Sequence, residues 1–245
     1  MPIRNVALDI DARGGAVAVP RLTATMPGDM VLQARSTLSG DASKPAVTGD
    51  FSLVGPKLRE TLKWLEVDTS AMPAGKLQKA SVKGRMASTG GNVQVTDAVF
   101  ELDDMKGTGG VVVTFSVPLS VVAHVELDTL DLDPFLAGGK TAGAGGGAAK
   151  PATAPAPGGG AVSGPTVGFK TKIAKLIYNK ETIGGVEVDV ALQGSTLRIS
   201  DVKVANIGGG GRFALRGSVA NYGSSDPHPD IAFNFEAPDM GRVMK

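Results

Sequence analysis

GVEVDVALQGSTLRI (residues 185–199) shows the alternating pattern from which the fold class is predicted. Its apolar residues recur at every second position, and they are Val186, Val188, Val190 and Leu192. Because successive side chains of a β-strand point to opposite faces, this period of two predicts a strand with one apolar and one water-facing side. Gly194 interrupts the alternation and a second alternating run follows it, so the stretch predicts two antiparallel strands joined by a tight turn.

The same alternation extends along most of the chain. It is found in Val6, Leu8 and Ile10 near the start and in Phe213 and Leu215 near the end. Short turns rich in Gly, Asn or Asp separate the alternating runs, which is typical of an antiparallel meander. We therefore expect a mainly β protein, an elongated antiparallel β-repeat that forms a twisted, groove-like sheet with one or two short amphipathic helices.

An internal repeat accompanies the alternation. NVALDIDARGGAVAV (residues 5–19) aligns without gaps on residues 185–199. A weaker third copy, NVQVTDAVF (residues 92–100), resembles TLRISDVKV (residues 196–204). Repeated units that cannot each close a core usually stack into an elongated array, so the repeat also favours an extended sheet.

One segment breaks the β pattern. PKLRETLKWLEV begins at Pro56 and carries Leu58, Leu62 and Leu65 at helical spacing, which predicts a short amphipathic helix near residues 56–66. Its apolar face has two interpretations, packing against the sheet or contact with lipid, and packing is the commoner meaning of such a face.

The helix start is repeated near the end of the chain. FSLVGPKLRETLK (residues 51–63) aligns on FNFEAPDMGRVMK (residues 233–245), with Phe on Phe, Pro on Pro and Lys on Lys. This predicts a second helix over residues 239–245. Because the chain stops inside that copy, we expect it to be a piece of a longer protein.

Residues 138–165 divide the chain. They are Gly, Ala and Pro almost throughout, so they hold too little apolar surface to offset the entropy lost on ordering. We expect a flexible linker between a β-repeat region over residues 1–137 and a second one over residues 166–245.

Composition excludes several classes of protein. The 245 residues include 25 basic and 24 acidic side chains, and the formal net charge of +1 leaves no basic excess to bind a nucleic acid backbone. The absence of cysteine excludes disulfides, thiolate metal sites and a cysteine nucleophile. No uncharged run reaches the roughly 20 residues that a transmembrane helix needs.

Two segments could bind phosphate. Gly139-Lys140-Thr141 is similar to the end of a P-loop, but the glycine expected five residues before Gly139 is replaced by Pro134. Residues 208–211 are four glycines followed by Arg212, but the flanking strand patterns offer no helix N-terminus to the anion. Neither segment predicts a cofactor site.

Acidic and histidine residues could bind metal or act in catalysis. Asp128, Asp131 and Asp133 lie close together, but the glycine and distal glutamate of a calcium loop are missing. His124 and His228 lie far apart in the sequence, without a cysteine or an obvious third ligand. We therefore expect no catalytic residue, metal or cofactor, and a protein that is not an enzyme.

The apolar side chains of the alternating runs are the candidate binding residues. A continuous face of Val, Leu and Ile would bind acyl chains without head-group specificity. The candidate lining of such a groove is Val6, Leu8, Ile10, Val93, Val95, Val186, Val188, Val190, Leu197, Ile199, Phe213 and Leu215.

Three passages resemble the AsmA family of envelope proteins. Residues 51–86 are similar to a recurrent passage of that family, in which Pro-x-Leu-Arg opens a helix that ends in Trp-Leu before a strand. LDTLDLDPFLAGG (residues 127–139) is similar to a second element, Leu-Asp-Leu-Asp-x-Tyr/Phe-Leu. Residues 186–219 resemble the family's closing module, with Ile207 and the glycines after it in place of a Tyr-Gly-Gly turn. The N-terminal membrane helix of full-length members is missing from this sequence.

The resemblance implies a location and a function. It implies an inner-membrane anchor upstream, a periplasmic location, and a long β-groove that carries phospholipid between membranes and serves outer-membrane biogenesis, with possible envelope partners. An alternative from a different class is a non-enzymatic scaffold for outer-membrane protein assembly, in which the apolar faces close on one another.

Overall fold

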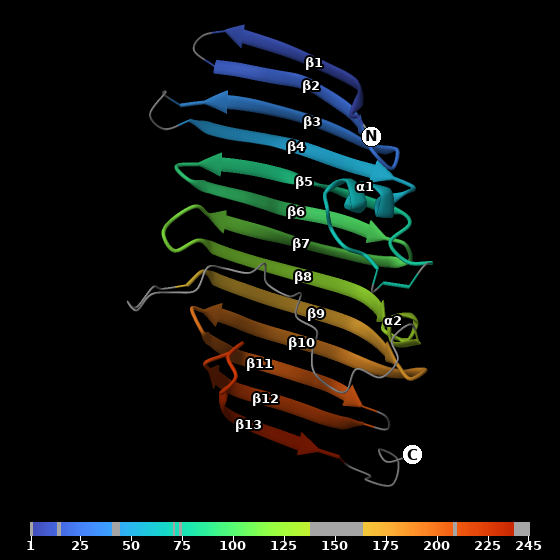
Figure 1. Ribbon diagram of the computed structural model, residues 1–245, viewed down its shortest axis with the longest axis vertical. Coiled ribbons are helices and arrows are strands. Elements are labelled where there is room, and N and C mark those ends of the chain that lie inside the picture. The colour runs from blue at the N-terminus through green and yellow to red at the C-terminus, as the bar shows by residue number, and fades with distance from the viewer. Residues whose placement is uncertain are drawn as a thin grey trace.

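The computed structural model describes residues 2–13, 16–40, 45–70, 72–73, 75–137, 164–207 and 210–237. These residues form one sheet and two short helices (Figure 1). The strands are β1 (Arg4–Arg13), β2 (Ala16–Met26), β3 (Met30–Ser39), β4 (Ala46–Gly55), β5 (Ala80–Thr89), β6 (Asn92–Leu102), β7 (Met105–Thr114), β8 (Ser120–Asp131), β9 (Thr166–Tyr178), β10 (Glu181–Gln193), β11 (Thr196–Ile207), β12 (Gly211–Ala220) and β13 (His228–Glu236). The helices are α1 (Leu58–Trp64) and α2 (Asp133–Ala137).

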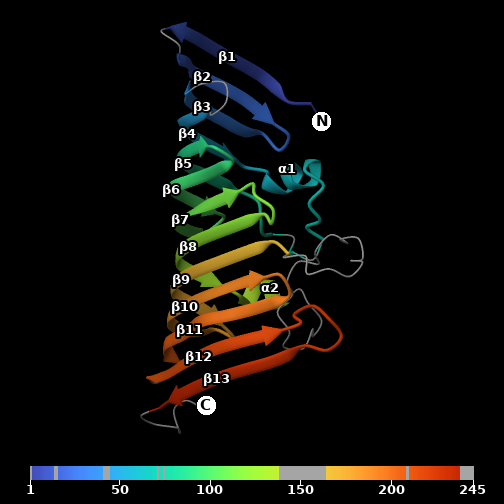
Figure 2. The same cartoon turned by 90° about the vertical axis from the view of Figure 1, so that its left-hand side faces the viewer.

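The sheet contains 13 strands in their sequence order. Each strand pairs with the next, and all pairs but one are antiparallel. Figures 1 and 2 show the strands stacked along the long axis of the molecule, with β1 at one end and β13 at the other. The sheet does not close, so the predicted fold class, a mainly β, elongated and open sheet with short helices, is confirmed.

The one parallel pair joins β8 to β9. Ser120 is opposite Thr166 and Asp131 is opposite Ile177, so both strands run the same way. A parallel pair needs a long connection that brings the chain back to the starting edge, whereas a hairpin needs only a few residues. That connection contains the predicted linker, of which residues 138–163 lie outside the described residues. The two predicted β regions therefore belong to one continuous sheet.

The two faces of the sheet differ in chemistry. Two rows of paired residues illustrate the apolar face. One row is Leu22, Ala34, Phe51, Gly84 on β2 to β5, then Gly109, Val125, Thr171, Val188, Val202, Leu215 and Phe233 on β7 to β13. The next row is Ala24, Leu32, Leu53, Val82, Phe100, Gly107, Leu127, Ile173, Val186, Val204, Phe213 and Phe235.

The opposite face carries ion pairs across neighbouring strands. Arg85 lies 2.7 Å from Asp97, and Lys170 lies 3.4 Å from Asp189. Their side chains are largely exposed. Exposed pairs of this kind contribute at most about 1 kcal/mol each, so this face is best described as solvated.

The sequence repeat is visible in the backbone. The pair Arg13 and Ala16 has its counterpart in Gln193 and Thr196, and in both hairpins a bulge lies on the second strand, a few residues beyond that pair. The weaker third copy follows the same plan. Thr96 and Asp97 of β6 lie in a bulge, as do Ser200 and Asp201 of β11. The repeated unit is therefore a bulged hairpin whose apolar residues stay on one face.

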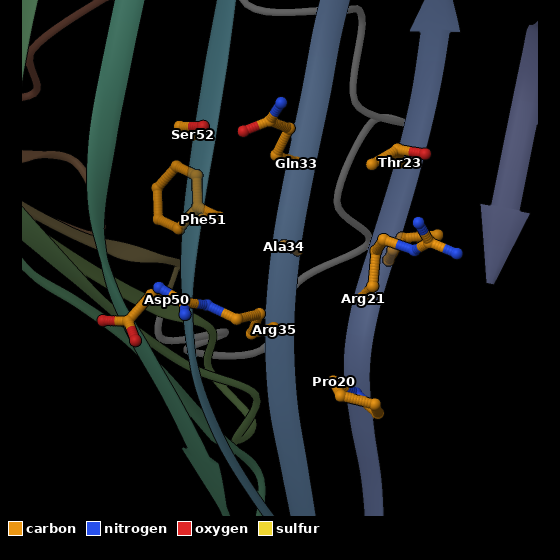
Figure 3. Close-up of a pocket in the computed structure, with 10 residues that line it drawn as sticks. Pro20, Arg21, Thr23, Gln33, Ala34, Arg35, Asp50, Phe51 and Ser52 are labelled. Carbon is orange, nitrogen blue, oxygen red and sulfur yellow. The ribbon is translucent and has the colours of Figure 1, made fainter. Parts of the chain in front are cut away.

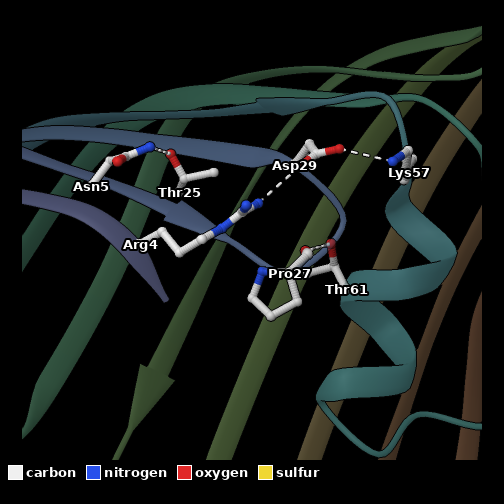
Figure 4. A network of polar contacts seen from close by, with 7 residues as sticks. All are labelled: Arg4, Asn5, Thr25, Pro27, Asp29, Lys57 and Thr61. Carbon is white, nitrogen blue, oxygen red and sulfur yellow. Dashed lines mark hydrogen bonds and ion pairs between the residues drawn. The ribbon is translucent and has the colours of Figure 1, made fainter. Parts of the chain in front are cut away.

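Helix α1 packs beside the turn between β2 and β3 (Figure 4). The Thr61 hydroxyl donates a 2.6 Å hydrogen bond to the Pro27 carbonyl, and Lys57 Nζ donates to Asp29 at 2.9 Å. Arg4 of β1 also donates to Asp29, at 3.1 Å. At the same turn Met30 is only 1% exposed. The helix predicted near residues 56–66 is confirmed, and the one predicted over residues 239–245 lies outside the described residues.

Two aspartates hold loops by hydrogen bonds at the side of the sheet where α1 lies. Asp103, in the turn between β6 and β7, accepts backbone N–H bonds from Leu77, Gln78 and Lys79 at 2.6, 2.8 and 2.9 Å. Asp133, the first residue of α2, accepts N–H bonds from the turn between β9 and β10. Both helices lie at this edge, which we call the helix edge (Figure 1). In the described part of the chain, no helix has the length and apolar character to cross a bilayer.

Candidate functional site

The apolar face is the candidate site, because its apolar side chains form an extended surface that the rest of the described chain leaves largely uncovered. The 12 candidate residues come from five strands, and all of them lie on it. Val186, Val188 and Val190 of β10 pair with Val204, Val202 and Ile199 of β11. Leu8 of β1 pairs with Leu22 in the same row of the sheet, and Val6 and Ile10 follow by alternation. The remaining candidates on this face are Val93, Val95, Leu197, Phe213 and Leu215.

The apolar face is the more crowded face of the sheet, and we call it the inner face. In the central strands its valines, such as Val82, Val95 and Val111, are half-buried. Valines on the opposite face of neighbouring strands are more exposed, at 53% for Val54 and 50% for Val122. The residue type is the same on both faces, so the difference reflects closer crowding of neighbours on the apolar side. We call this inner face of β1 to β13 the apolar groove.

No second layer covers most of the apolar groove within the described residues. Fully buried apolar side chains are few in that part of the chain, namely Ala24, Met30, Ala98, Ile173 and Val186. At the outer strands the lining is open to solvent, with Ile10 62% and Phe233 73% exposed. An extended apolar surface left open in this way marks a site of contact with a membrane, a lipid or a protein.

Two glycines of β7 allow neighbouring groups to pack closely at the centre of the sheet. A Cβ atom at Gly107 would lie 2.6 Å from both the Glu126 carbonyl oxygen and the Phe100 ring. At Gly109 it would collide with the His124 carbonyl oxygen and lie 3.3 Å from Val125 Cα. Only a residue without a side chain fits at these two positions, because the Phe100 ring and the Leu127 side chain fill the space at Gly107 and the backbone of β8 fills it at Gly109.

The groove changes character at the helix edge. On β8 the groove-facing series continues from Leu127 to Thr129 and Asp131, and on β9 it continues from Ile173 to Lys175. Asp131 and Lys175 are the two charged residues that face the groove from the described strands. Sequence reasoning missed Lys175. The signal was present in KTKIAKLIY, where Lys170 and Lys172 share the polar phase and Lys175 falls in the apolar phase.

A hollow lies between β2, β3 and β4 (Figure 3), and residues of both faces line it. Its volume is about 420 Å³, and its lining includes Arg21, Gln33, Arg35 and Asp50. Arg21 is already paired with Asp9 at 2.9 Å, and the side chains of both partners are largely exposed. Ligand sites usually bury most of their ligand, whereas this hollow is wide open to solvent.

The residues that could have carried chemistry do not converge. Within the described residues no three potential ligands are grouped to hold a metal ion. His124 lies on the polar face opposite Gly110 of β7, whereas His228 lies on the outermost strand β13, with Nδ1 3.0 Å from the Asp226 carbonyl oxygen. The Asp133 carboxylate accepts N–H bonds from Asn179 and Lys180. Residues 139–141, 208 and 209 lie outside the described residues.

Comparison of the chain with protein-family models, curated proteins and solved structures finds no match to any of them.

Proposed function

We propose that the chain is a periplasmic segment of an AsmA-like, inner-membrane-anchored protein, and that its apolar groove binds phospholipid and conducts it between membranes. The observation that carries the proposal is the open inner face, which stays apolar from β1 to β13 and lacks a covering layer in the described residues. The protein would act by binding and guidance, without catalysis.

The dimensions of the groove support this function. Thirteen strands at the usual spacing of about 4.8 Å give a groove of up to roughly 60 Å along the stack. That length is about twice the hydrocarbon thickness of a bilayer, which is about 30 Å. Each methylene group removed from water contributes about 0.8 kcal/mol, so a lining of Val, Leu and Phe can hold acyl chains.

Uniformity of the lining supports movement as well as binding. Neighbouring strands present similar apolar residues to the groove, so an acyl chain that slides past one strand meets an equivalent surface on the next. A ligand bound in this way has no strong preference for one position over most of the groove. This arrangement suits conduction better than tight storage at a single site.

The alternative function, a scaffold for outer-membrane protein assembly, was expected to close its apolar faces on one another. The described residues form a single open sheet instead of a sealed sandwich. The open sheet supports lipid binding over this alternative.

Photo-crosslinking tests the proposal. A photoreactive residue at Val188 or Leu215, both groove-facing, should capture phospholipid from cell membranes, as read by mass spectrometry of the crosslinked protein. The same residue at Glu187, which faces outward and lies 3.9 Å from Lys172, should not. Absence of phospholipid at both groove positions would remove lipid conduction from consideration.

A further inference from the structure

At the helix edge of the apolar groove lies one cation, Lys175, that pairs with no other described residue, and we propose that it binds the phosphate of a diacyl lipid's head group while the acyl chains lie in the groove. This inference rests on the proposed function and adds to it a polar anchor and an orientation for the ligand.

The position of Lys175 is fixed by strand register. It is opposite Thr129 of β8 and Gly184 of β10, two positions on from Ile173, which faces the groove between Leu127 and Val186. Neither neighbour directly across carries a large side chain or a charge. Lys175 therefore lies on the groove face with no bulky or charged residue directly opposite it on either neighbouring strand.

Lys175 differs from the other lysines of its strand. Lys170 and Lys172 face outward and pair with Asp189 and Glu187. Lys175 is exposed and has no hydrogen-bond or ion-pair partner among the described residues. The acidic residue nearest in register on the same face is Asp131, whose carboxylate already accepts the Asp133 N–H at 3.0 Å. The positive charge of Lys175 is thus available to an anion.

The lining beyond Lys175 suits acyl chains. Along β9 the groove-facing residues toward the opposite edge are Ile173, Thr171, Phe169 and Val167. The nine residues from Val167 to Lys175 are separated by eight rises and span about 26 Å of strand. This exceeds half the hydrocarbon thickness of a bilayer, about 15 Å, so the tails of one lipid fit along the strand. A cation at one end of such a surface matches a molecule with a phosphate at one end and two apolar tails.

The experiment compares two lipids with the same acyl chains, phosphatidylethanolamine and diacylglycerol, which differ by the phosphate-bearing head group. The whole chain is incubated with each lipid in detergent micelles, and retained lipid is quantified by native mass spectrometry. Because a charge-assisted hydrogen bond is worth more than a neutral one, we expect the unmodified protein to favour phosphatidylethanolamine by about tenfold.

Three variants locate the preference. Lys175→Gln should abolish it while diacylglycerol binding stays the same, and Lys175→Arg should keep it. Lys172→Gln is the matched control, because it removes a lysine from the outward face of the same strand, and it should also keep the preference. An unchanged preference in Lys175→Gln, or an equal loss in Lys172→Gln, would overturn the inference.

The two levels of the proposal fail in different ways. Equal retention of both lipids by the unmodified protein would remove the phosphate contact and leave the groove as an acyl-chain site. Retention of neither lipid would remove lipid binding itself, and the anchor with it.

Discussion

Glu187 and Val188 are neighbours on β10 that face opposite sides of the sheet. Glu187 is opposite Lys172 and Lys203 on the polar face, whereas Val188 is opposite Thr171 and Val202 in the apolar groove. A substitution at either position therefore reaches one surface and leaves the other intact.

The first prediction concerns Val188→Glu. Val188 is half-buried on an open face, so a carboxylate there can stay hydrated in the lipid-free protein. We expect a loss of stability of about 1 kcal/mol, with the fold kept, and a clear fall in bound phospholipid. Thermal melting and lipid extraction measure the two effects.

Glu187→Val is the matched control for this variant. It removes one exposed ion pair, worth at most about 1 kcal/mol, and should leave lipid occupancy unchanged. A Val188→Glu protein that unfolds would favour the scaffold function with closed apolar faces. One that folds and keeps its full lipid content would exclude this strand from the groove.

The second prediction concerns Asp103, whose carboxylate accepts three backbone N–H groups. Asp103→Ala leaves two part-buried donors and one exposed donor without their acceptor and places alanine at a φ of 52°, so we expect a loss of about 2–4 kcal/mol of unfolding free energy in urea titrations. Asp104→Ala is the control, since its side chain is 97% exposed and only approaches Lys76 at 3.9 Å. Equal effects of the two substitutions would show that the Asp103 carboxylate does not hold the loop.

The third prediction concerns Gly109 on the groove floor. Gly109→Ala directs a methyl group against the backbone of β8, which cannot move aside cheaply, so we expect a loss of about 1–3 kcal/mol. Gly168→Ala, on β9, meets only the Val122 side chain at 3.5 Å and should change stability by less than about 1 kcal/mol. Urea denaturation of both variants tests the comparison, and a neutral Gly109→Ala would contradict the close approach.

The fourth prediction concerns pH and α1. The hydrogen bond and charge of Lys57, with a smaller contribution from Arg4, hold the pKa of the Asp29 carboxyl below its ordinary value. The folded state therefore binds this proton less readily than the unfolded chain. The contact stabilises α1 above about pH 4, the ordinary range of an aspartate, and the stabilisation is lost as pH falls through the lowered pKa.

Trp64 reports on this contact directly, because it is the last residue of α1 and the one tryptophan of the chain. Its fluorescence should change on acidification in the unmodified protein. In Asp29→Asn that transition should be absent, since the amide does not titrate, and Asn accepts the positive φ of 56° at this position. A transition of equal size in Asp29→Asn would assign it to another group.

The faces and the hairpins could be predicted from the sequence because both are local. Alternation places Val186 and Glu187 on opposite sides whatever the rest of the chain does. The repeat extends to backbone detail, since Asn5 and Gly185, which align, both have positive φ, at 52° and 61°. The face that each side chain occupies and the repeat of the hairpins can thus be predicted from the local sequence.

Contacts between distant segments could not be predicted in this way. Asp133 fastens a turn at Asn179 and Lys180, more than 40 positions along the chain. The parallel pairing of β8 with β9 depends on where the intervening connection delivers the chain, and no periodicity records that. Lys175 was detectable by its phase, but its isolation from acidic partners is a property of the assembled sheet.

The parallel junction has a consequence for how the molecule folds. Every other pairing is antiparallel, so β1 to β8 and β9 to β13 can each grow by adding the next strand against the previous one. Pairing Ser120 with Thr166 requires closing a longer loop. The chain loses the entropy of loop closure before the contacts between β8 and β9 can compensate for it. We therefore expect two nuclei that assemble independently and meet last at this seam, which makes the β8–β9 boundary the slow step of folding.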